Sequence, residues 1–194
     1  MKVLHSETAV RSFQVAGSLP VPQYDRLNLG CGRKHENEVL NLDCNPETQP
    51  DVVHDLNSLP WPFPNDHFRE VMAYDCLEHL DNFISVMEEI HRICRDGAIV
   101  RISVPHFSCA NAYTDPTHQR AFGYFSFDYL TGENGMDFYT RARFKRLSRR
   151  MFFFPSLINK LIWRLANRYP MVYELRWTWI FPAWYLYFEL EVQK

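Results

Sequence analysis

Two histidines and an aspartate lie close together in the chain between Pro105 and Phe122. They are His106, Asp115 and His118, in a stretch with no strand or helix period. An imidazole titrates near neutral pH and can remove a proton, and a carboxylate beside it can orient the ring. Loops of this length in a compact domain are usually functional. We therefore predict that His106 or His118 is a general base and that Asp115 orients it.

Two further roles are possible for these three residues. In the first, Asp115 caps a turn and His118 packs against its neighbours, so both are structural. In the second, His106, Asp115 and His118 hold a divalent metal ion. Their spacing matches no familiar zinc pattern, and we expect no metal.

A second group of residues has the spacing of a nucleoside-binding site. Gly30-Cys31-Gly32 follows the apolar run 26–29, and glycines after a strand let the backbone approach a ligand closely. Asp43 ends the next apolar run, where an acid can accept hydrogen bonds from both ribose hydroxyls. A nicotinamide dehydrogenase would need a glycine at position 35, which is His35, and an acid further along the chain. The pattern therefore disfavours a dehydrogenase.

The segments that must position these residues alternate between apolar strands and other elements. We predict strands over 26–29, 39–43, 51–55, 68–74 and 98–104. Several are apolar without alternation, as in a parallel sheet buried on both faces. Residues 81–95 have helical spacing, with Asp81 as the N-cap and Asp96-Gly97 as the stop. This order predicts a doubly wound, mostly parallel, Rossmann-like α/β domain.

Several motifs along this part of the chain have a recognisable order and spacing. They are Leu27-Asn28-Leu29-Gly30-Cys31-Gly32, Asn41-Leu42-Asp43, Asp51-Val52-Val53-His54-Asp55-Leu56, Leu77-Glu78-His79-Leu80 and Arg101-Ile102-Ser103-Val104-Pro105-His106. Over residues 24–130 the chain resembles the class I methyltransferases that depend on S-adenosylmethionine (SAM), and more narrowly the small type 11 methyltransferases. The resemblance implies a seven-stranded, mostly parallel sheet with an antiparallel pair at its edge, for which segments 144–154 and 184–192 fit.

The resemblance also implies SAM as the cofactor, methyl transfer as the activity, and a role for individual residues. The cofactor contacts that it implies are Asn28, Gly30, Cys31 and Gly32 at the methionine part, Asp43 at the ribose, Cys44, Asp55 and Leu56 at the adenine, and Tyr74 and Asp75 near the sulfonium and the amine. Many members have an acid where this chain has Asn28. Glu78 and His79 are expected to be structural. The implied acceptor is a hydroxyl of a small-molecule or sugar-containing metabolite.

The connection between Gly32 and Val39 is shorter than a parallel crossover usually needs. We expect either a first helix reduced to one turn or strand boundaries that differ from those predicted.

The second half of the chain is basic and aromatic. Six of the ten residues from 141 to 150 are basic, and aromatic residues follow. An edge strand with a basic face accounts for this run best. Two alternatives are contact with an anionic membrane and contact with RNA, the latter in an RNA methyltransferase. The aromatic residues of 171–190 can form a core, a homodimer interface or an acceptor pocket. A non-catalytic SAM-fold protein that binds a partner through this half is a further alternative.

Composition and length favour one domain. The chain has 194 residues and a net charge of −2, with no strong charge excess that would point to nucleic acid. Its five cysteines are scattered without a Cys-x-x-Cys motif, and no signal-peptide pattern opens the sequence, so we expect a cytoplasmic protein. We predict an N-terminal arm over 1–23 and a single domain over 24–194, elaborated at about 151–183.

Overall fold

The structure is a computed structural model, and it describes residues 24–133, 135 and 137–194. The arm predicted for residues 1–23 lies outside these described residues. A seven-stranded sheet in the order β3-β2-β1-β4-β5-β7-β6 forms the centre of the fold. Its strands are β1 (Arg26–Leu29), β2 (Leu40–Asp43), β3 (Val52–Val53), β4 (Phe68–Tyr74), β5 (Cys94–Pro105), β6 (Arg143–Phe152) and β7 (Tyr185–Gln193).

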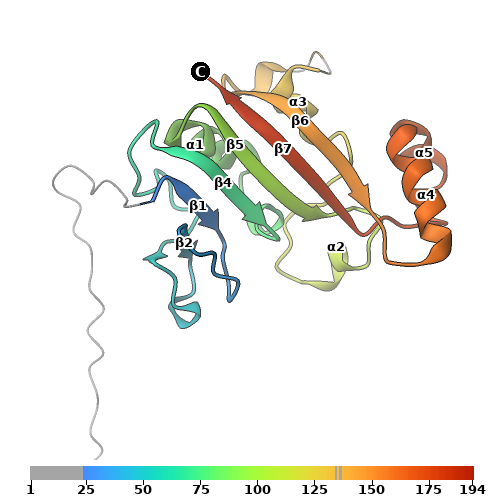
Figure 1. The fold of residues 1–194 in the computed structure, drawn as a ribbon, viewed down its shortest axis with the longest axis horizontal. Helices are drawn as coiled ribbons and strands as arrows, with labels where there is room; N and C mark the ends of the chain where they lie inside the picture. The colour runs from blue at the N-terminus through green and yellow to red at the C-terminus, as the bar shows by residue number, and fades with distance from the viewer. Residues whose placement is uncertain (1–23, 134, 136) are drawn as a thin grey trace, which may run out of the picture.

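The strand directions confirm the predicted fold class. Strands β3, β2, β1, β4 and β5 are parallel to one another. Strand β7 runs antiparallel to β5, and β6 runs antiparallel to β7 (Figure 1). The sheet is therefore mostly parallel and Rossmann-like, and β7 and β6 are the antiparallel pair that the resemblance implied.

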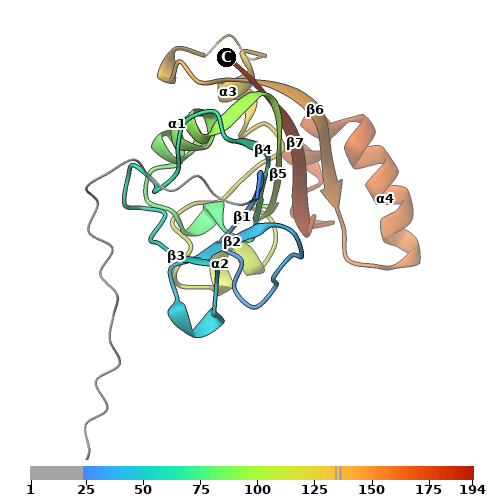
Figure 2. The same cartoon turned by 60° about the vertical axis from the view of Figure 1, so that its left-hand side comes forward.

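The helices lie around and beyond this sheet (Figures 1 and 2). They are α1 (Phe83–Ile93), α2 (Asn111–Thr114), α3 (Asp128–Thr131), α4 (Leu157–Arg168) and α5 (Pro170–Arg176), with short 3-10 turns η1 (Pro46–Thr48), η2 (Leu77–His79) and η3 (Asp137–Tyr139). Helices α4 and α5 pack together beyond the end of β6 and form most of the predicted elaboration. Within the described residues, no helix combines the length and the apolar character that a bilayer span requires.

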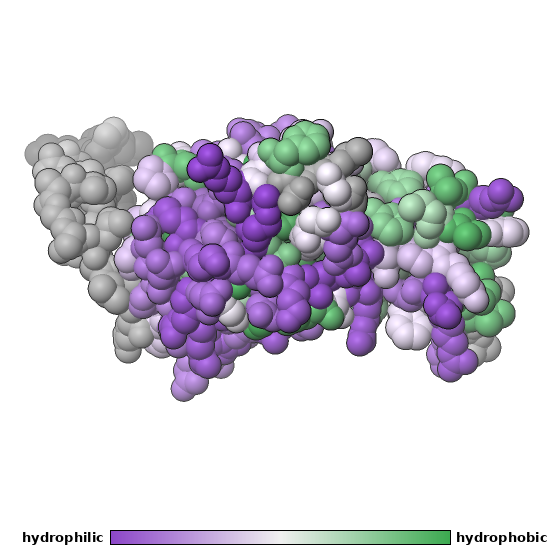
Figure 3. All heavy atoms as spheres, turned by 90° about the horizontal axis from the view of Figure 1, so that it is seen from above, coloured by the Kyte–Doolittle hydropathy of each residue, from purple (hydrophilic) through white to green (hydrophobic). Residues whose placement is uncertain are grey.

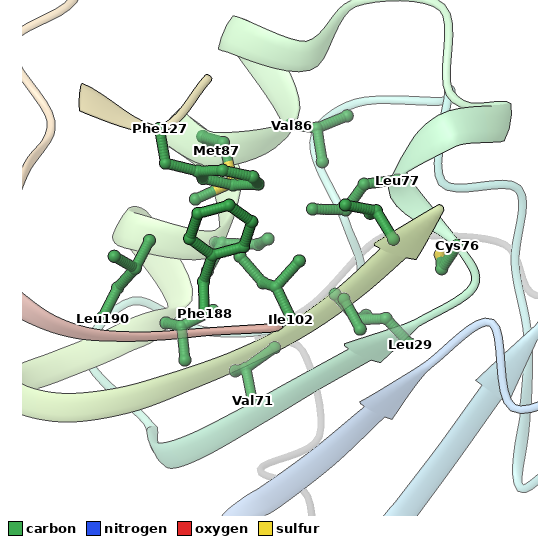
Figure 4. Packing of buried hydrophobic residues seen from close by; sticks show 14 of the residues in the cluster. Leu29, Val71, Cys76, Leu77, Val86, Met87, Ile102, Phe127, Phe188 and Leu190 are labelled. Atoms are coloured by element: carbon green, nitrogen blue, oxygen red, sulfur yellow. The ribbon is translucent and has the colours of Figure 1, made fainter. Parts of the chain in front are cut away.

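Alternate residues of the central strands point toward α1 and α3 and form the core (Figure 4). On β4, β5 and β7 the core residues are Val71, Ala73, Val100, Ile102, Val104, Leu186, Phe188 and Leu190, all buried. Phe127, just before α3, joins the layers, because its ring centre lies 4.3 Å from that of Phe188 and 5.2 Å from that of Phe83 on α1. Burying one such ring contributes about 1.5–3 kcal/mol to folding.

The opposite face of β5 and β7 is polar, so burial on both faces is wrong for β5, whereas β1 and β4 each have three consecutive buried residues (27–29 and 71–73) as predicted. Arg101 on β5 forms ion pairs with Glu70 on β4 and with Glu189 on β7. Arg26 on β1 also forms an ion pair with Glu70, at 2.6 Å. These side chains are partly exposed, and burial alternates along β5 and β7.

The crossover from β1 to β2 contains no helix, so the one-turn helix that we expected as one option is absent there. Two buried asparagines hold its irregular backbone in place. Asn28 Nδ2 donates to the Lys34 carbonyl oxygen and to Asn41 Oδ1, each at 3.1 Å. Asn41 Oδ1 in turn accepts from the Glu36 backbone N–H at 3.0 Å. Side-chain amides thus replace the internal hydrogen bonds that a helix would supply.

Helix α1 is shorter than predicted at both ends. Its N-cap is Asn82, whose Oδ1 accepts from the Ser85 N–H at 3.2 Å, and not Asp81. The helix ends at Ile93, and β5 begins directly at Cys94. Gly97, predicted to stop the helix, lies inside β5 with a positive φ of 74°. Pairing of Cys94 with Phe68 on β4 ends the helix, a long-range contact that local sequence cannot report.

The basic run from 141 to 150 forms most of β6, the edge strand of the sheet. Much of its charge is neutralised within the protein. Arg146 pairs with Glu133 at 2.7 Å, Lys145 with Glu191 at 3.5 Å, and Arg149 with Asp128. The run is therefore accounted for as an edge strand with a basic face.

Candidate functional site

The loop after β1 and the end of β2 are joined by the carboxylate of Asp43. Its Oδ2 accepts from the Gly32 N–H at 2.8 Å, and its Oδ1 accepts from the Asn45 N–H at 2.8 Å. A carboxylate oxygen can accept a further hydrogen bond, so both oxygens keep capacity for a ligand. Asp43 thus shapes the glycine loop and remains partly exposed beside it.

The two glycines of this loop have positive φ values but different surroundings. Gly30 has a φ of 62°, and a Cβ there would lie 2.8 Å from Cys76 Sγ in the loop after β4. Gly32 has a φ of 50°, and a Cβ there would have no neighbour within 4 Å. The side chain of Cys31, between them, is buried. Gly30 therefore serves packing, whereas the backbone at Gly32 borders open space that a ligand can enter.

The residues predicted at the adenine come together only in part. Burial first, and then the neighbouring carboxylates of Asp43 and Asp55, raise the pKa of the Cys44 thiol. These three residues therefore lie close to one another, and Cys44 and Asp55 are exposed. Leu56 differs, because its side chain is buried in the core, while its carbonyl oxygen accepts from Trp61 Nε1 at 3.0 Å.

The end of β4 contributes Tyr74 and Asp75. Asp75 has a positive φ of 52°, and its N–H donates to the Ser103 carbonyl oxygen at 2.9 Å, which turns its carboxylate out of the sheet. Lys34 Nζ lies 3.7 Å from that carboxylate. Burial first, and then Asp75, raise the pKa of Tyr185 to about 12, so the Tyr185 hydroxyl stays protonated beside Asp75. Burial first, and then Tyr187, raise the pKa of Tyr74 to about 12.

Asn28 lies apart from this group. Its amide is occupied by the crossover backbone and by Asn41, and its side chain is buried. In this structure it contributes to the cofactor site by holding the loop that contains Lys34, and a direct contact remains a prediction.

His106, the first candidate base, is fully buried at the end of β5. Its Nδ1 accepts from the Ser108 N–H at 3.1 Å, so its Nε2–H donates to Glu174 Oε1 on α5 at 3.2 Å. Glu174 also accepts from the Tyr124 N–H at 2.5 Å. No sequence pattern pointed to Glu174, which connects α5 to the loop after β5. Both nitrogens of His106 are thus engaged inside the protein.

His118, the second candidate base, lies with two residues that we predicted to be structural. Glu78 and His79 belong to η2, directly after β4, and His118 belongs to the loop after β5. One ligand atom from each of the three lies within 4.8 Å of the others. The sequence could have indicated this proximity, because the three residues follow two predicted parallel strands that are neighbours in the sheet.

The electrostatics of this cluster follow from its burial. Glu78 is 1% exposed, and burial, followed by the charges of Asp75 and Asp115, raises its pKa to about 7. Burial and the neighbouring His118 lower the pKa of His79. The ring centres of the two histidines are 4.6 Å apart.

The Asp115 carboxylate forms no hydrogen bond with the ring of either candidate base among the described residues; it is linked through Thr117 to a different histidine, His79. Its Oδ1 accepts from the Thr117 N–H at 2.9 Å and from the Thr117 hydroxyl at 2.7 Å. The Thr117 oxygen is left to accept from His79 Nδ1 at 2.8 Å. Arg120, in the same loop, is structural, since it donates to the carbonyl oxygens of Leu80 and Asp81 at 2.6 Å each.

The strand ends fit SAM, which when bound supplies a methyl carbon activated by its sulfonium. Gly32 gives open space beside the backbone, and the carboxylates of Asp43, Asp55 and Asp75 follow the ends of neighbouring strands. SAM carries an ammonium, a positive sulfonium and two ribose hydroxyls, and carboxylates are suitable partners for all of them. Ligands of such sheets bind where these residues lie, outside the carboxyl ends of the strands.

Comparison with known proteins agrees with this fold. Residues 27–102 match a family model described as a methyltransferase domain, and these residues contain β1 to β4, α1 and most of β5. A search of curated protein sequences gave no match.

Several solved structures with the same fold are described as SAM-dependent methyltransferases. A SAM-dependent methyltransferase from Archaeoglobus fulgidus is 16% identical over 85% of this chain and 84% of its own, with a TM-score of 0.58. One from Mesorhizobium loti is 15% identical over 91% and 93%, with a TM-score of 0.54. These likenesses establish the fold. Residues 27–102 therefore form a methyltransferase domain within a chain that has the fold of SAM-dependent methyltransferases, and SAM is the cofactor that this domain implies.

Proposed function

We propose that this protein transfers the methyl group of SAM to a hydroxyl oxygen of a small-molecule or sugar-containing acceptor. The observation that carries the proposal is the pairing of two groups at one edge of the sheet. Asp43 and Asp75 are the acids that we assign to the cofactor, and the polar cluster with His118 includes Glu78, which lies near enough to Asp75 for their charges to interact. Orienting the two reactants accounts for most of such a rate enhancement.

Methylation of a hydroxyl also needs a way to remove its proton. In the reaction a C–O bond forms, the C–S bond breaks, sulfur keeps the electron pair, and the hydroxyl proton leaves the acceptor. We assign a role in promoting this proton removal to His118, because its ring is partly exposed while that of His106 is sealed between Ser108 and Glu174. His106 is then a residue that positions the loop after β5.

Isothermal titration with SAM and with S-adenosylhomocysteine tests the cofactor half of this proposal. We expect one binding site per chain for each ligand. An acceptor screen with methyl-labelled SAM then separates an enzyme from a non-catalytic SAM-fold protein. If neither nucleotide binds to the folded protein, the proposed function is wrong.

An RNA methyltransferase, the alternative raised by the basic run, gains little support. Arg146 and Arg149 of β6 are paired with acidic residues of their own chain, so they are not available as a row of phosphate contacts. We propose the cytoplasm as the location, because the five cysteines are unpaired thiols, including the exposed Cys44, and a reducing compartment preserves them.

We further propose that α4 and α5 bring this protein to an anionic lipid surface. These helices and the turn after them expose large apolar side chains, among them Leu161, Leu165, Leu175, Trp177, Trp179 and Ile180. Figure 3 shows apolar surface gathered at this end of the molecule, whereas the opposite end is mostly hydrophilic. An apolar groove of about 340 Å³ runs between the two helices. Patches of this kind mark interaction sites.

The charges around the patch favour a lipid surface over a second copy of the chain. Lys160, Arg164, Arg168 and Arg176 are exposed on the two helices. The one acidic residue of this segment, Glu174, is turned inward to His106. Trp and Leu beside exposed cations are typical of helices that lie in the interface of an anionic membrane, where each cation contributes about 1 kcal/mol.

Vesicle flotation tests this surface. Wild-type protein should bind phosphatidylcholine vesicles that contain one quarter phosphatidylglycerol, and binding should fall about tenfold in Leu175→Asp and in Trp179→Ala. The matched control is Phe138→Ala, which removes an exposed ring of η3 outside the patch. A stable dimer in light scattering that Leu175→Asp dissociates, with no vesicle binding, would contradict the proposal.

A further inference from the structure

The cluster of Glu78, His79 and His118 has the composition of a metal site. Its candidate ligand atoms, one carboxylate oxygen and two imidazole nitrogens, lie within 4.8 Å of one another. Ligands about 2.1 Å from a metal ion are at most about 4.2 Å apart, so the side chains need to close by less than ~1 Å. Such a change is within the reach of side-chain rotation.

Glu78 supplies an observation that a packed structural role does not explain. It is 1% exposed, and neither of its carboxylate oxygens has a hydrogen-bond partner of normal geometry among the described residues; only the backbone N–H groups of Cys76 and of Glu78 itself lie near enough to lower its pKa. A buried carboxylate without a partner is strongly unfavourable, and such groups are normally paired or coordinate a metal. The charges that surround it, Asp75 and Asp115, are acidic and add to the cost. A cation at this position would satisfy both oxygens and offset the acidic surroundings.

The two imidazoles are already oriented as metal ligands usually are. His79 Nδ1 lies 2.8 Å from the Thr117 hydroxyl oxygen, which itself donates to Asp115. His118 Nδ1 lies 3.3 Å from the Ala112 carbonyl oxygen. When Nδ1–H donates in this way, Nε2 carries the lone pair and is free to bind a metal. Thr117, Asp115 and Ala112 would thus be the outer partners that hold the ligands.

We propose that Glu78, His79 and His118 bind a divalent transition-metal ion such as Zn²⁺, Mn²⁺ or Fe²⁺ at the acceptor side of the cofactor site. Two imidazoles and one carboxylate suit these ions, whereas Mg²⁺ prefers oxygen ligands and water. Three protein ligands leave coordination positions open for a substrate. The site joins η2, after β4, to the loop after β5, so an ion would also link the two loops that border the acceptor region.

The role of the ion in catalysis rests on the proposed function. An acceptor hydroxyl that binds the ion loses its proton to solvent more readily, because the metal stabilises the alkoxide. The alkoxide oxygen then forms the new C–O bond as the C–S bond breaks and sulfur keeps the electron pair. His118 would promote proton removal as a ligand of the ion and would not itself receive the proton.

Metal titration of the full-length protein tests the site without any assay of activity. Protein stripped with a chelator and dialysed should bind one Zn²⁺ by calorimetry and one Co²⁺ with visible d–d absorption. Glu78→Gln and His118→Ala should each weaken binding by at least about 100-fold, since outer partners alone are worth 10–100-fold. The control His35→Ala removes an exposed histidine outside the cluster and should bind as wild type does. Circular dichroism shows whether each variant is folded.

The outcomes separate this inference from the proposed function. Folded wild-type protein that binds neither Zn²⁺, Mn²⁺ nor Co²⁺ stoichiometrically would overturn the metal site, as would binding that Glu78→Gln and His118→Ala leave unchanged. SAM titration of the same stripped sample is independent of the ion, so failure there counts against the proposed function. Activity that persists after chelation but is lost in His118→Ala would show a metal-free histidine base and would also refute the metal site.

Discussion

Gly30→Ala should lower the free energy of unfolding by about 2–5 kcal/mol, the largest stability loss that we expect from a single added methyl group. The new Cβ would lie 2.8 Å from Cys76 Sγ and 3.1 Å from Cys76 Cβ, and Cys76 is buried and has little room to move. Overpacking of this kind costs about 1–3 kcal/mol. The positive φ of 62° adds about 1–2 kcal/mol for a residue with a side chain. Urea denaturation followed by tryptophan fluorescence measures the change.

Gly32→Ala is the matched control for this prediction. Its φ of 50° carries a similar conformational cost, but the added Cβ meets no atom within 4 Å. It should therefore lose only about 1–2 kcal/mol, while its affinity for SAM falls because the methyl group enters the open space. Equal stability losses in the two variants would show that contact with Cys76 does not constrain Gly30.

Asp43→Ala should weaken SAM binding by at least about 100-fold. The carboxylate is placed to accept from ribose hydroxyls, and it also holds the Gly32 N–H at 2.8 Å. Hydrogen bonds to a charged group contribute about 1.5–3 kcal/mol each, and 1.4 kcal/mol is a factor of ten in affinity. Loss of two such bonds therefore accounts for the expected effect. Calorimetric titration with SAM and with S-adenosylhomocysteine measures it.

Asp43→Asn separates the two roles of this residue. Its amide oxygen can still accept from Gly32, which keeps the glycine loop in place, but its amide nitrogen cannot accept from the Asn45 N–H, and we expect an intermediate loss of about tenfold. Asp96→Asn is the negative control, because Asp96 lies near the start of β5, far along the strand from the carboxyl ends that form the site. An Asp43→Ala protein that binds SAM as tightly as wild type would remove Asp43 from the cofactor site.

The sequence predicted the local elements of the cofactor half closely. Strands β1 and β4 have the predicted bounds, and β2 differs by one residue, because each is an apolar run between glycine, proline or polar residues. The boundary between the predicted helix and β5 was wrong. The helix ends at Ile93 and β5 begins at Cys94, earlier than predicted, because Cys94 pairs with β4 in the sheet. The absence of a helix between β1 and β2 followed from the short connection, but the asparagines that replace it could not be foreseen.

The sequence could not distinguish between the two candidate bases. His106 and His118 were equivalent as titratable residues of one loop. Packing of α5 buried the first against Glu174, which lies 68 positions away along the chain. Folding of the same loop placed the second beside Glu78 and His79 after β4. Residue type defined the set of candidates, and burial then distinguished among them.

By itself, the sequence determined the α/β class, the methyltransferase domain over residues 27–102, and the glycine loop with Asp43, since these depend on periodicity and on short motifs. The tertiary structure decided what depends on distant residues meeting. It neutralised the basic run of β6 with Asp128 and Glu133, left the apolar side chains of α4 and α5 exposed, and assembled Glu78, His79 and His118. Hydrophobic patterns act over a few residues, whereas the environment of a charge is set by every element that packs around it.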